Sequence, residues 1–251
     1  MATVVVNSTI AVPIVLANSS VVPDGRRNSP VSIGTETDRT RLHREPTRGS
    51  HDLAVIRGVI DAAPICHLGL TDHDGRPLVI PTIHARIENV LYIHGSVASR
   101  TIRRLADGTD VCCTVTVVDG IVVARSAFWS SMNYRSVMVF GRSRLVEDRD
   151  EIARALDAIV NRMIPGRSGE IREATEPELR ATRVVAIPLD EASAKIRIGD
   201  PNDDPGDLDG NAWAGVVPTG VRISDPISAG NLRAAIPVPR SVRRIAEAWG
   251  T

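Results

Sequence analysis

Apolar and polar residues alternate in short runs along most of the chain, which is the pattern of half-buried β-strands. Turn signals separate these runs, among them Asp72-His73-Asp74-Gly75, Glu88-Asn89 and Asp119-Gly120. Because short turns join neighbouring strands, we predict antiparallel pairing. The predicted strands cover residues 65–71, 77–87, 90–93, 111–118, 121–128, 136–146, 184–189 and 194–198.

A helical period of apolar residues occurs in only a few places. One helix is predicted to begin after an N-cap at Ser50 and to end before Pro64, and a longer one covers residues 149–163. Residues 175–178 have the spacing of a capping box, and residues 240–249 are typical of a short closing helix. The predicted fold class is therefore mainly β with helices, an antiparallel β-barrel with helices across its openings.

The end of the apolar strand 90–93 carries the first candidate chemistry. The sequence His94-Gly95-Ser96-Val97-Ala98-Ser99-Arg100 follows it, and helix-forming residues 101–105 come next. Backbone N–H groups, two hydroxyls, a guanidinium and the helix dipole can converge at such a corner, which is the chemistry that binds a phosphate. The alternative is a plain strand-to-helix corner in which Ser96 or Ser99 only caps the helix.

Composition limits the class of protein. Of the 251 residues, 43% are apolar, and 30 Lys and Arg balance 30 Asp and Glu. The zero net charge argues against a nucleic-acid partner, and no stretch has the ~18 consecutive apolar residues of a membrane span. The three cysteines include the adjacent Cys112 and Cys113, so we expect no disulfide framework and a cytoplasmic location.

Three regions are expected along the chain. The first 23 residues have no charged side chain, but Asn7 and Pro13 interrupt the apolar run and no basic segment precedes it, which argues against a signal peptide. We expect residues 1–40 to be an irregular extension, residues 41–222 to form the barrel domain and residues 223–251 to form a C-terminal arm.

Aromatic residues are rare and concentrated. Phe and Tyr occur twice each and Trp three times, and four of these residues, Phe128, Trp129, Tyr134 and Phe140, fall in one short segment. They indicate either ordinary packing or a wall against which a flat ligand, such as an isoalloxazine or a porphyrin, stacks.

Several short blocks together resemble the pyridoxamine 5′-phosphate oxidase-like superfamily, in the branch of flavin-nucleotide-binding and nitroimidazole-resistance-like proteins. The blocks are Ile80-Pro81-Thr82, His94-Gly95-Ser96, residues 124–128, residues 131–137 and Phe140-Gly141-Arg142. The resemblance extends from about residue 40 to at least residue 221. It implies an FMN-binding split β-barrel that forms a homodimer, with two flavin sites at the subunit interface.

The resemblance also implies roles for individual residues. The strand that contains Pro81, Thr82, Ile83 and His84 would lie along the flavin ring. The flavin phosphate would be held at residues 94–100, where His94, Ser96, Ser99 and Arg100 stand, with Arg103 as a weaker candidate. Thr114 would lie on the neighbouring strand, and Trp213 would come from the partner subunit.

Two departures from the family pattern fall near the expected ligand. Trp129-Ser130 stands where relatives commonly have two histidines, and His84 stands where we expect an aromatic residue. The first change makes one side of the pocket more apolar, so the substrate, and with it the cofactor, can differ from the family norm. The arginine and histidine pattern that binds pyridoxamine phosphate is not evident, so oxidation of that vitamin precursor is not predicted.

The function that we predict is an FMN-dependent oxidoreductase. A reduced nicotinamide would supply the electrons and a small planar acceptor, nitro-aromatic or quinone-like, would receive them, with His84, Tyr134 and Arg135 as candidates to assist. No zinc signature occurs.

Three alternatives stay open. One is a heme-binding split barrel with His84 or His94 as the axial iron ligand, and a second is a non-catalytic flavin or heme carrier or sensor. The third is a tailoring enzyme of secondary metabolism, and a deazaflavin is an alternative cofactor. His43, His51, His67 and His73 are expected at the surface or in turns.

Overall fold

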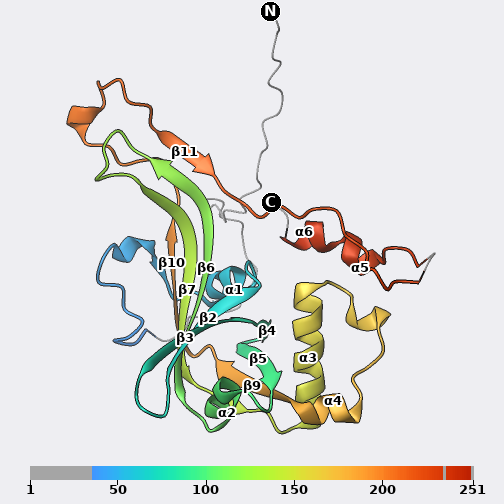
Figure 1. Cartoon of the computed structure of the whole chain (residues 1–251). Coiled ribbons are helices and arrows are strands. Elements are labelled where there is room, and N and C mark those ends of the chain that lie inside the picture. Colours follow the sequence, from blue (N-terminus) through green and yellow to red (C-terminus); the bar gives the residue numbers. More distant parts are fainter. Residues whose placement is uncertain (1–35, 234–235, 250–251) are drawn as a thin grey trace, which may run out of the picture.

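The computed structural model describes residues 36–233 and 236–249, so most of the predicted extension 1–40 lies outside the described residues. Figure 1 shows a long, curved sheet and a smaller sheet, with helices packed around them. Every strand pair in the two sheets is antiparallel. The predicted architecture, mainly antiparallel β with helices, is confirmed.

The larger sheet has the strand order β1-β10-β7-β6-β2-β3, and β11 pairs with the far part of β6. Alternate residues of these strands point into the main core, which α1 (Leu53–Ile60) and α2 (Arg100–Ala106) close. The strands are β1 (Gly49–Ser50), β2 (Ile65–Thr71), β3 (Pro77–Ile83), β6 (Asp110–Val123), β7 (Ser131–Arg142), β10 (Glu191–Arg197) and β11 (Gly215–Pro218).

The predicted hairpin at Asp119-Gly120 is wrong, because both residues lie within β6, a single strand of 14 residues. The register with β7 shifts between Val118 and Gly120, which is a β-bulge. A Cβ at position 120 would lie 2.9 Å from Val216 Cγ1 on β11, so the close approach of β11 requires a glycine there. The chain turns instead at residues 124–130.

The smaller sheet has the order β4-β5-β9-β8. It consists of β4 (Ala85–Ile87), β5 (Val90–Ser96), β8 (Arg144–Leu145) and β9 (Thr182–Pro188). The predicted single strand 77–87 is therefore wrong, since β3 pairs with β2 whereas β4 pairs with β5. The chain crosses from one sheet to the other at His84, which is fully buried.

The helices begin and end close to the residues that local signals predict. α3 (Arg149–Met163) has the predicted bounds, and α4 (Glu176–Ala181) begins with the predicted capping box. α1 (Leu53–Ile60) is capped by Asp52, whose carboxylate accepts a 2.7 Å hydrogen bond from the Ala54 N–H, and not by Ser50. The remaining helices are α2 (Arg100–Ala106), α5 (Arg240–Arg243) and α6 (Ile245–Trp249). None of the helices in the described ranges combines the length and apolar character that a bilayer crossing needs.

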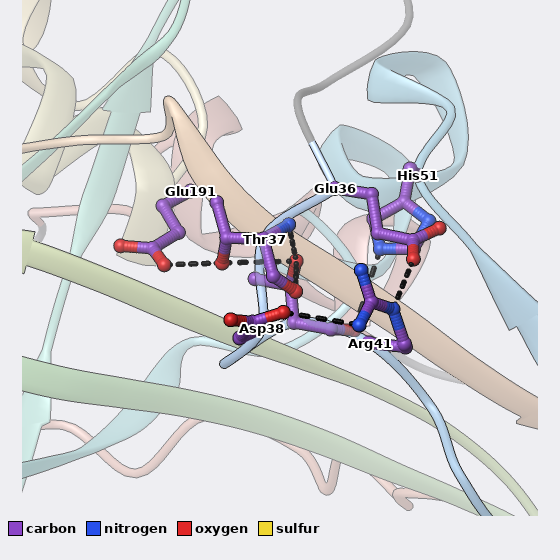
Figure 2. Close-up of polar contacts among 7 residues, drawn as sticks. Glu36, Thr37, Asp38, Arg41, His51 and Glu191 are labelled. Atoms are coloured by element: carbon purple, nitrogen blue, oxygen red, sulfur yellow. Dashed lines mark hydrogen bonds and ion pairs between the residues drawn. The ribbon is translucent and has the colours of Figure 1, made fainter.

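The first described residues lie against β10 (Figure 2). Thr37 and Arg39 donate hydrogen bonds to the carboxylate of Glu191, with Arg39 Nε at 3.0 Å from Oε1. The Arg39 guanidinium also lies over the Phe140 ring, 5.0 Å from its centroid. This segment therefore covers one end of the outer face of the larger sheet.

The C-terminal arm packs against the end of α3. The Trp249 Nε1–H donates to the Met163 carbonyl at 3.1 Å, and the Arg162 guanidinium lies 4.4 Å from the centroid of the Trp249 ring. The Ser241 N–H donates to Glu170 at 3.1 Å. These contacts join the arm to the domain in the same chain.

Candidate functional site

At the corner between β5 and α2, the two serines have the capping role that the sequence indicates, and they can still donate to an anion. β5 extends to Ser96, three residues beyond the predicted strand end, and α2 begins at Arg100. The Ser99 hydroxyl accepts a hydrogen bond from the Ile102 N–H at 3.3 Å and so caps the helix. The Ser96 hydroxyl accepts one from the Ala98 N–H at 3.2 Å. Both serines therefore have the local capping role, and their hydroxyl hydrogens remain available to an anion.

Gly95 allows α2 to lie close to β5. A Cβ at this position would be 2.7 Å from Ile102 Cγ1, which is shorter than real side-chain contacts. The glycine thus serves helix packing, and it fixes how far the first turn of α2 stands from the end of the strand.

Most backbone donors at the corner are already bonded within the chain. The Val97 N–H donates to Ala181 O, the Ser99 N–H to Ser96 O and the Arg103 N–H to Ser99 O, each at 3.0 Å. Within the described ranges, the N–H groups of Arg100 and Thr101 have no acceptor. The backbone can therefore offer two donors to an anion, fewer than the sequence led us to expect.

Two guanidinium groups are open to solvent beside these donors. Arg100 and Arg103 are exposed, and neither forms an ion pair with any residue that the structure describes. Arg104, on the same helix, donates instead to the Thr71 carbonyl at 3.3 Å. A guanidinium without a carboxylate partner is suited to bind phosphate oxygens.

The larger sheet brings two predicted residues into one row on its outer face. The register aligns Pro81 with His67 and His67 with Thr114, so these three side chains point to the same side. Ile83 shares this face, whereas Thr82 points to the opposite one. The predicted ring-contacting strand therefore presents Pro81 outward, whereas Ile83, at the end of the strand, packs against the core of the smaller sheet.

His67 is a candidate that the sequence analysis missed, because it was assigned only to the surface. It is exposed in the middle of the row, between Pro81 and Thr114. The signal was present in the alternation, since His67 stands between two core residues, Cys66 and Leu68. An imidazole on an open sheet face is available to a ligand or a partner.

His94 has an unsatisfied ring nitrogen. It is half-buried on β5, opposite Val184, and its Nδ1 is buried without a hydrogen-bond partner among the described residues. Burial lowers the pKa of His94. Burial therefore favours the neutral ring, which is the form that ligates a metal or accepts a hydrogen bond.

His84 does not have the surroundings that its predicted roles require. Its side chain has no exposed surface, and Nε2 lies 3.2 Å from the Ile60 carbonyl at the end of α1. A side chain enclosed in the core does not reach a ligand on the sheet face. The structure thus places the His84 side chain in packing at the crossing between the two sheets. Its expected position along the flavin ring, which concerns the backbone of the strand, and its candidacy in catalysis stay predictions.

Tyr134 and Arg135 are adjacent on β7 and point to opposite faces. Arg135 donates to Asp119 through Nε at 2.9 Å and Nη2 at 2.7 Å, and this carboxylate raises the pKa of Arg135. Its guanidinium is thus held at the bulge. Tyr134 is half-buried on the outer face, opposite Val118, and stays a candidate.

Trp213 is exposed just before β11. Figure 1 shows β11 and α2 at opposite ends of the molecule. One chain therefore does not bring Trp213 to the corner at Arg100, and joint contact with one ligand requires two chains.

Two hollows lie away from these residues. One, of about 430 Å³, includes Arg125, Asp203 and Gly215, and the other, of about 890 Å³, lies between Arg167 and the C-terminal arm. Neither is lined by a predicted site residue. Within the described ranges, no three or more His, Cys, Asp or Glu side chains are placed to hold a metal ion.

Two antiparallel sheets that part at His84, with a strand-to-helix corner between them, define the class of split β-barrel proteins. The chain matches the model of the family described as pyridoxamine 5′-phosphate oxidase over residues 52–196. It belongs to this family, and the resemblance seen in the sequence is confirmed.

Solved structures extend the comparison. The chain is 35% identical to a flavocytochrome from Azotobacter vinelandii, over 83% of this chain and 96% of that one, with a TM-score of 0.78. It is 38% identical to an FAD and heme binding protein from Mycobacterium smegmatis, over 79% and 97%, with a TM-score of 0.76. A putative 5-nitroimidazole antibiotic resistance protein from Bacteroides thetaiotaomicron is 26% identical over 59% and 86%, with a TM-score of 0.51. Comparison with curated proteins gives no match.

Proposed function

We propose that this protein binds a flavin at the β5–α2 corner and works as an electron carrier or oxidoreductase. The observation that carries the proposal is the corner itself, where Arg100 and Arg103 are exposed and, among the described residues, have no carboxylate partner, beside two backbone donors without an acceptor there. Two similar proteins, a flavocytochrome and an FAD and heme binding protein, support the cofactor class.

The donors at the corner fit the phosphate end of a flavin. The N–H groups of Arg100 and Thr101, the hydroxyls of Ser96 and Ser99 and the exposed guanidiniums all donate, as phosphate oxygens require. The outer-face row with Pro81 and Thr114 would flank the ring. FMN remains our sequence-based expectation, whereas the name of the M. smegmatis protein favours FAD.

When bound, a flavin supplies hydride and one-electron chemistry that no side chain can provide. We propose a reduced nicotinamide as the electron donor and a small nitro-aromatic or quinone-like molecule as the acceptor. Tyr134, on the outer face, is the remaining candidate to orient that acceptor. A carrier or sensor without turnover is the alternative use of the same site.

A homodimer would complete the site. The outward positions of β6 from Cys112 to Ile121, and of β7 from Met132 to Phe140, carry no charged side chain. Depletion of charge is the mark of an interface core, and a face shared by two copies would bring Trp213 of one chain near the other. We therefore propose that this outer face joins two copies.

Heme is the second candidate group, and His94 is the observation that favours it. Its buried Nδ1 has no partner within the described residues, and burial favours the neutral imidazole, which suits an axial iron ligand. The names of the two similar structures, a flavocytochrome and an FAD and heme binding protein, point the same way. His84 has the same orphaned nitrogen but is fully enclosed.

The visible absorption spectrum of the purified protein tests both groups. We expect a two-banded flavin spectrum, with a Soret band in addition if heme is bound. A colourless preparation is incubated with FAD, FMN and hemin separately. No spectral change with any of the three would overturn the proposal, and binding of a deazaflavin alone would replace the cofactor.

His94→Ala tests the axial ligand. The variant should lose or shift the Soret band while it keeps the flavin bands. His67→Ala, which changes the exposed histidine of the row, is the matched control, and a Soret change in that variant alone would move the ligand to His67. Oxidation of reduced nicotinamide with a panel of acceptors then separates an enzyme from a carrier.

A further inference from the structure

Two of the three cysteines of the chain lie together in the main core. Cys66 on β2 and Cys113 on β6 have no exposed surface and belong to the same cluster of buried residues. The sheet register pairs Cys113 with Leu68, which stands two residues beyond Cys66 and faces the same side. The two cysteines are therefore diagonal neighbours on adjacent strands, an arrangement in which side chains interact.

The two thiols share a side-chain hydrogen bond. This bond lowers the pKa of Cys66 to about 5, although burial acts in the opposite direction, and it raises the pKa of Cys113. The Cys66 sulfur therefore gives up its proton first, and the Cys113 S–H donates to the thiolate that results. A thiolate is the nucleophilic form of cysteine, and here a second thiol is in contact with it.

An imidazole completes the cluster. His84 stands two residues beyond Thr82, the β3 partner of Cys66, and its side chain is also fully enclosed. Since the Ile60 carbonyl oxygen only accepts, Nε2 of His84, at 3.2 Å, carries the ring proton. Nδ1 is then an acceptor, and it has no hydrogen-bond partner among the described residues. The ring also contributes to the low pKa of Cys66, so His84 is placed to take up the proton of that thiol.

Cys112 is next to this pair in sequence but lies outside it in space. Neighbouring strand positions face opposite sides of a sheet, so the Cys112 thiol points outward, where it is half-buried. All three cysteines are free. The chain thus contains its own control, a cysteine on the same strand that is not enclosed in the core.

We propose that Cys66 and Cys113 are a redox-active pair, which hydrogen peroxide converts to a disulfide bond within one chain. The Cys66 thiolate attacks a peroxide oxygen, so an S–O bond forms, the O–O bond breaks, and the hydroxide leaves as water with the proton from His84. The Cys113 sulfur then attacks the Cys66 sulfur, an S–S bond forms, and the S–O bond breaks to release a second water. Two thiols thus lose two electrons, and one peroxide becomes two waters.

Burial decides which oxidants can react with the pair. Enclosed thiols are reached only by a small neutral molecule during a local opening of the core, so bulky disulfides and charged reagents are excluded. Disulfide bonds of proteins in reducing compartments are mostly transient and redox-sensing. The pair is thus a two-electron site that goes beyond the proposed flavin site and does not depend on it.

Peptide mapping of the full chain tests the proposal. The reduced, folded protein is treated with hydrogen peroxide, the remaining thiols are blocked in urea, and the chain is digested with trypsin without reduction. The tryptic peptides 58–86 and 105–125, which carry Cys66 and Cys113, should become linked and should separate again with dithiothreitol. Peptides that stay unlinked, with Cys66 either unmodified or oxidised to a sulfonic acid, would overturn the proposal.

Cys112→Ser is the matched control, because peptide 105–125 contains both adjacent cysteines. This variant should form the linked peptides at the wild-type rate, whereas Cys66→Ser and Cys113→Ser should form none. A link that is lost in Cys112→Ser would show that the outward cysteine is the reacting partner, which contradicts the proposal.

A labelling measurement on the unmodified protein guards against a link that forms only in unfolded chains. Excess N-ethylmaleimide should block Cys112 in the folded protein and spare the enclosed pair, whereas in urea it should block all three cysteines. Peroxide added after the first blocking should still link Cys66 to Cys113. Equal blocking of all three in the folded protein would contradict the enclosed pair.

The pH dependence of bond formation tests which sulfur attacks. The rate should be level from about pH 7 upward, because the Cys66 thiolate is already formed there, whereas the rate of an ordinary thiol rises to about pH 8.5. A rate that keeps rising to that pH would overturn the role of Cys66 as the attacking thiolate. In His84→Gln the midpoint should move upward, and an unchanged midpoint would remove His84 from the step.

Discussion

Arg100 is the side chain whose charge matters most at the β5–α2 corner. Arg100→Ala removes an exposed guanidinium that has no carboxylate partner in the described structure, so a bound phosphate loses a charge-assisted hydrogen bond. We expect the flavin dissociation constant to rise about 10- to 100-fold, with the thermal midpoint of the apoprotein unchanged. Titration of the apoprotein by flavin fluorescence measures the effect.

Arg104→Ala is the matched control for Arg100→Ala, because Arg104 lies on the same helix but donates to the Thr71 carbonyl. Its flavin affinity should equal that of the wild type. Similar losses for both variants would mean that the general positive charge of α2, and not the corner, holds the flavin.

Single residues show where sequence reasoning reaches its limit. Alternation places His67 outward between Cys66 and Leu68 correctly, because burial in a strand depends on parity. It fails at His84, where no turn residue marks the crossing between sheets. That crossing depends on a tertiary contact, the His84 ring against the Ile60 carbonyl, which no local pattern records.

At the scale of elements, the packing of α2 on β5 depends on Gly95. In Gly95→Ala the new Cβ would lie 2.7 Å from Ile102 Cγ1, so α2 must shift away from the strand. We expect a loss of about 1–3 kcal/mol in the free energy of unfolding and weaker flavin binding. Urea unfolding of the variant, followed by fluorescence, measures the first effect.

Gly58→Ala is the control for a glycine substitution in an element. Position 58 is exposed in α1, and no atom of the part of the chain that the structure describes lies within 4 Å of a Cβ built there. Alanine should stabilise this helix by about 0.5–1 kcal/mol. If both alanine variants were stabilised, Gly95 would have no part in the packing of α2.

The contact between β5 and α3 makes the free energy of unfolding depend on pH in the alkaline range. The Tyr92 hydroxyl donates to Glu151 at 2.8 Å, and burial together with this carboxylate raises the pKa of Tyr92 to about 12. In the unfolded chain the phenol ionises near 10. Between these values the unfolded state loses the proton first, so the free energy of unfolding should fall as the pH rises from about 10 to 12.

Tyr92→Phe tests this dependence. The variant should be less stable by about 1 kcal/mol at neutral pH, because the hydrogen bond to Glu151 is lost. Its deficit should then shrink as the pH rises above about 10, since phenylalanine does not ionise. Urea unfolding at a series of pH values measures both, and a constant deficit would contradict the assignment.

Elements were predicted well where their signals are local. α3 has its predicted bounds because Asp148 caps it and its apolar period is regular, and α4 has its capping box. Asp119-Gly120 is the strongest local hairpin signal, and it was misleading. Here Asp119 binds Arg135 across the sheet and Gly120 admits β11, so long-range pairing turns a hairpin signal into a bulge.

At the scale of the whole molecule, the sequence indicated the barrel class and the strand-to-helix corner at residues 94–100. It did not indicate which distant segments pack on the barrel or lie near that corner. β11, which Trp213 shortly precedes, and α2, which begins at Arg100, lie at opposite ends of the molecule (Figure 1), so no single-chain pattern shows whether the two residues share a ligand. The N-terminal segment at Glu191 and the C-terminal arm at α3 likewise depend on side-chain contacts between residues far apart in sequence.

The attachment of the C-terminal arm rests on Trp249. Its ring lies 4.4 Å from the Arg162 guanidinium, and its Nε1–H donates to the Met163 carbonyl at 3.1 Å. Burial lowers the pKa of Arg162, because it disfavours the charged guanidinium. The nearby Trp249 ring stabilises this charge through a cation–π contact. Trp249→Ala should cost about 2 kcal/mol in the free energy of unfolding and release the arm to proteolysis. Trp249→Phe keeps a ring and loses the hydrogen bond, so it should cost about 1 kcal/mol.

Trp213→Ala is the control that separates the attachment of the C-terminal arm by Trp249 from a general effect of removing a tryptophan. Trp213 is exposed in the single chain, so its removal should leave the free energy of unfolding unchanged at concentrations where the protein is monomeric. Urea unfolding measures the stability of Trp249→Ala, Trp249→Phe and Trp213→Ala, and limited proteolysis measures whether the C-terminal arm is released in each. If Trp249→Ala were as stable and as protease-resistant as Trp213→Ala, the arm would be held by Ser241 and Glu170 instead. In that case Glu170→Gln, which weakens the other contact, should release it.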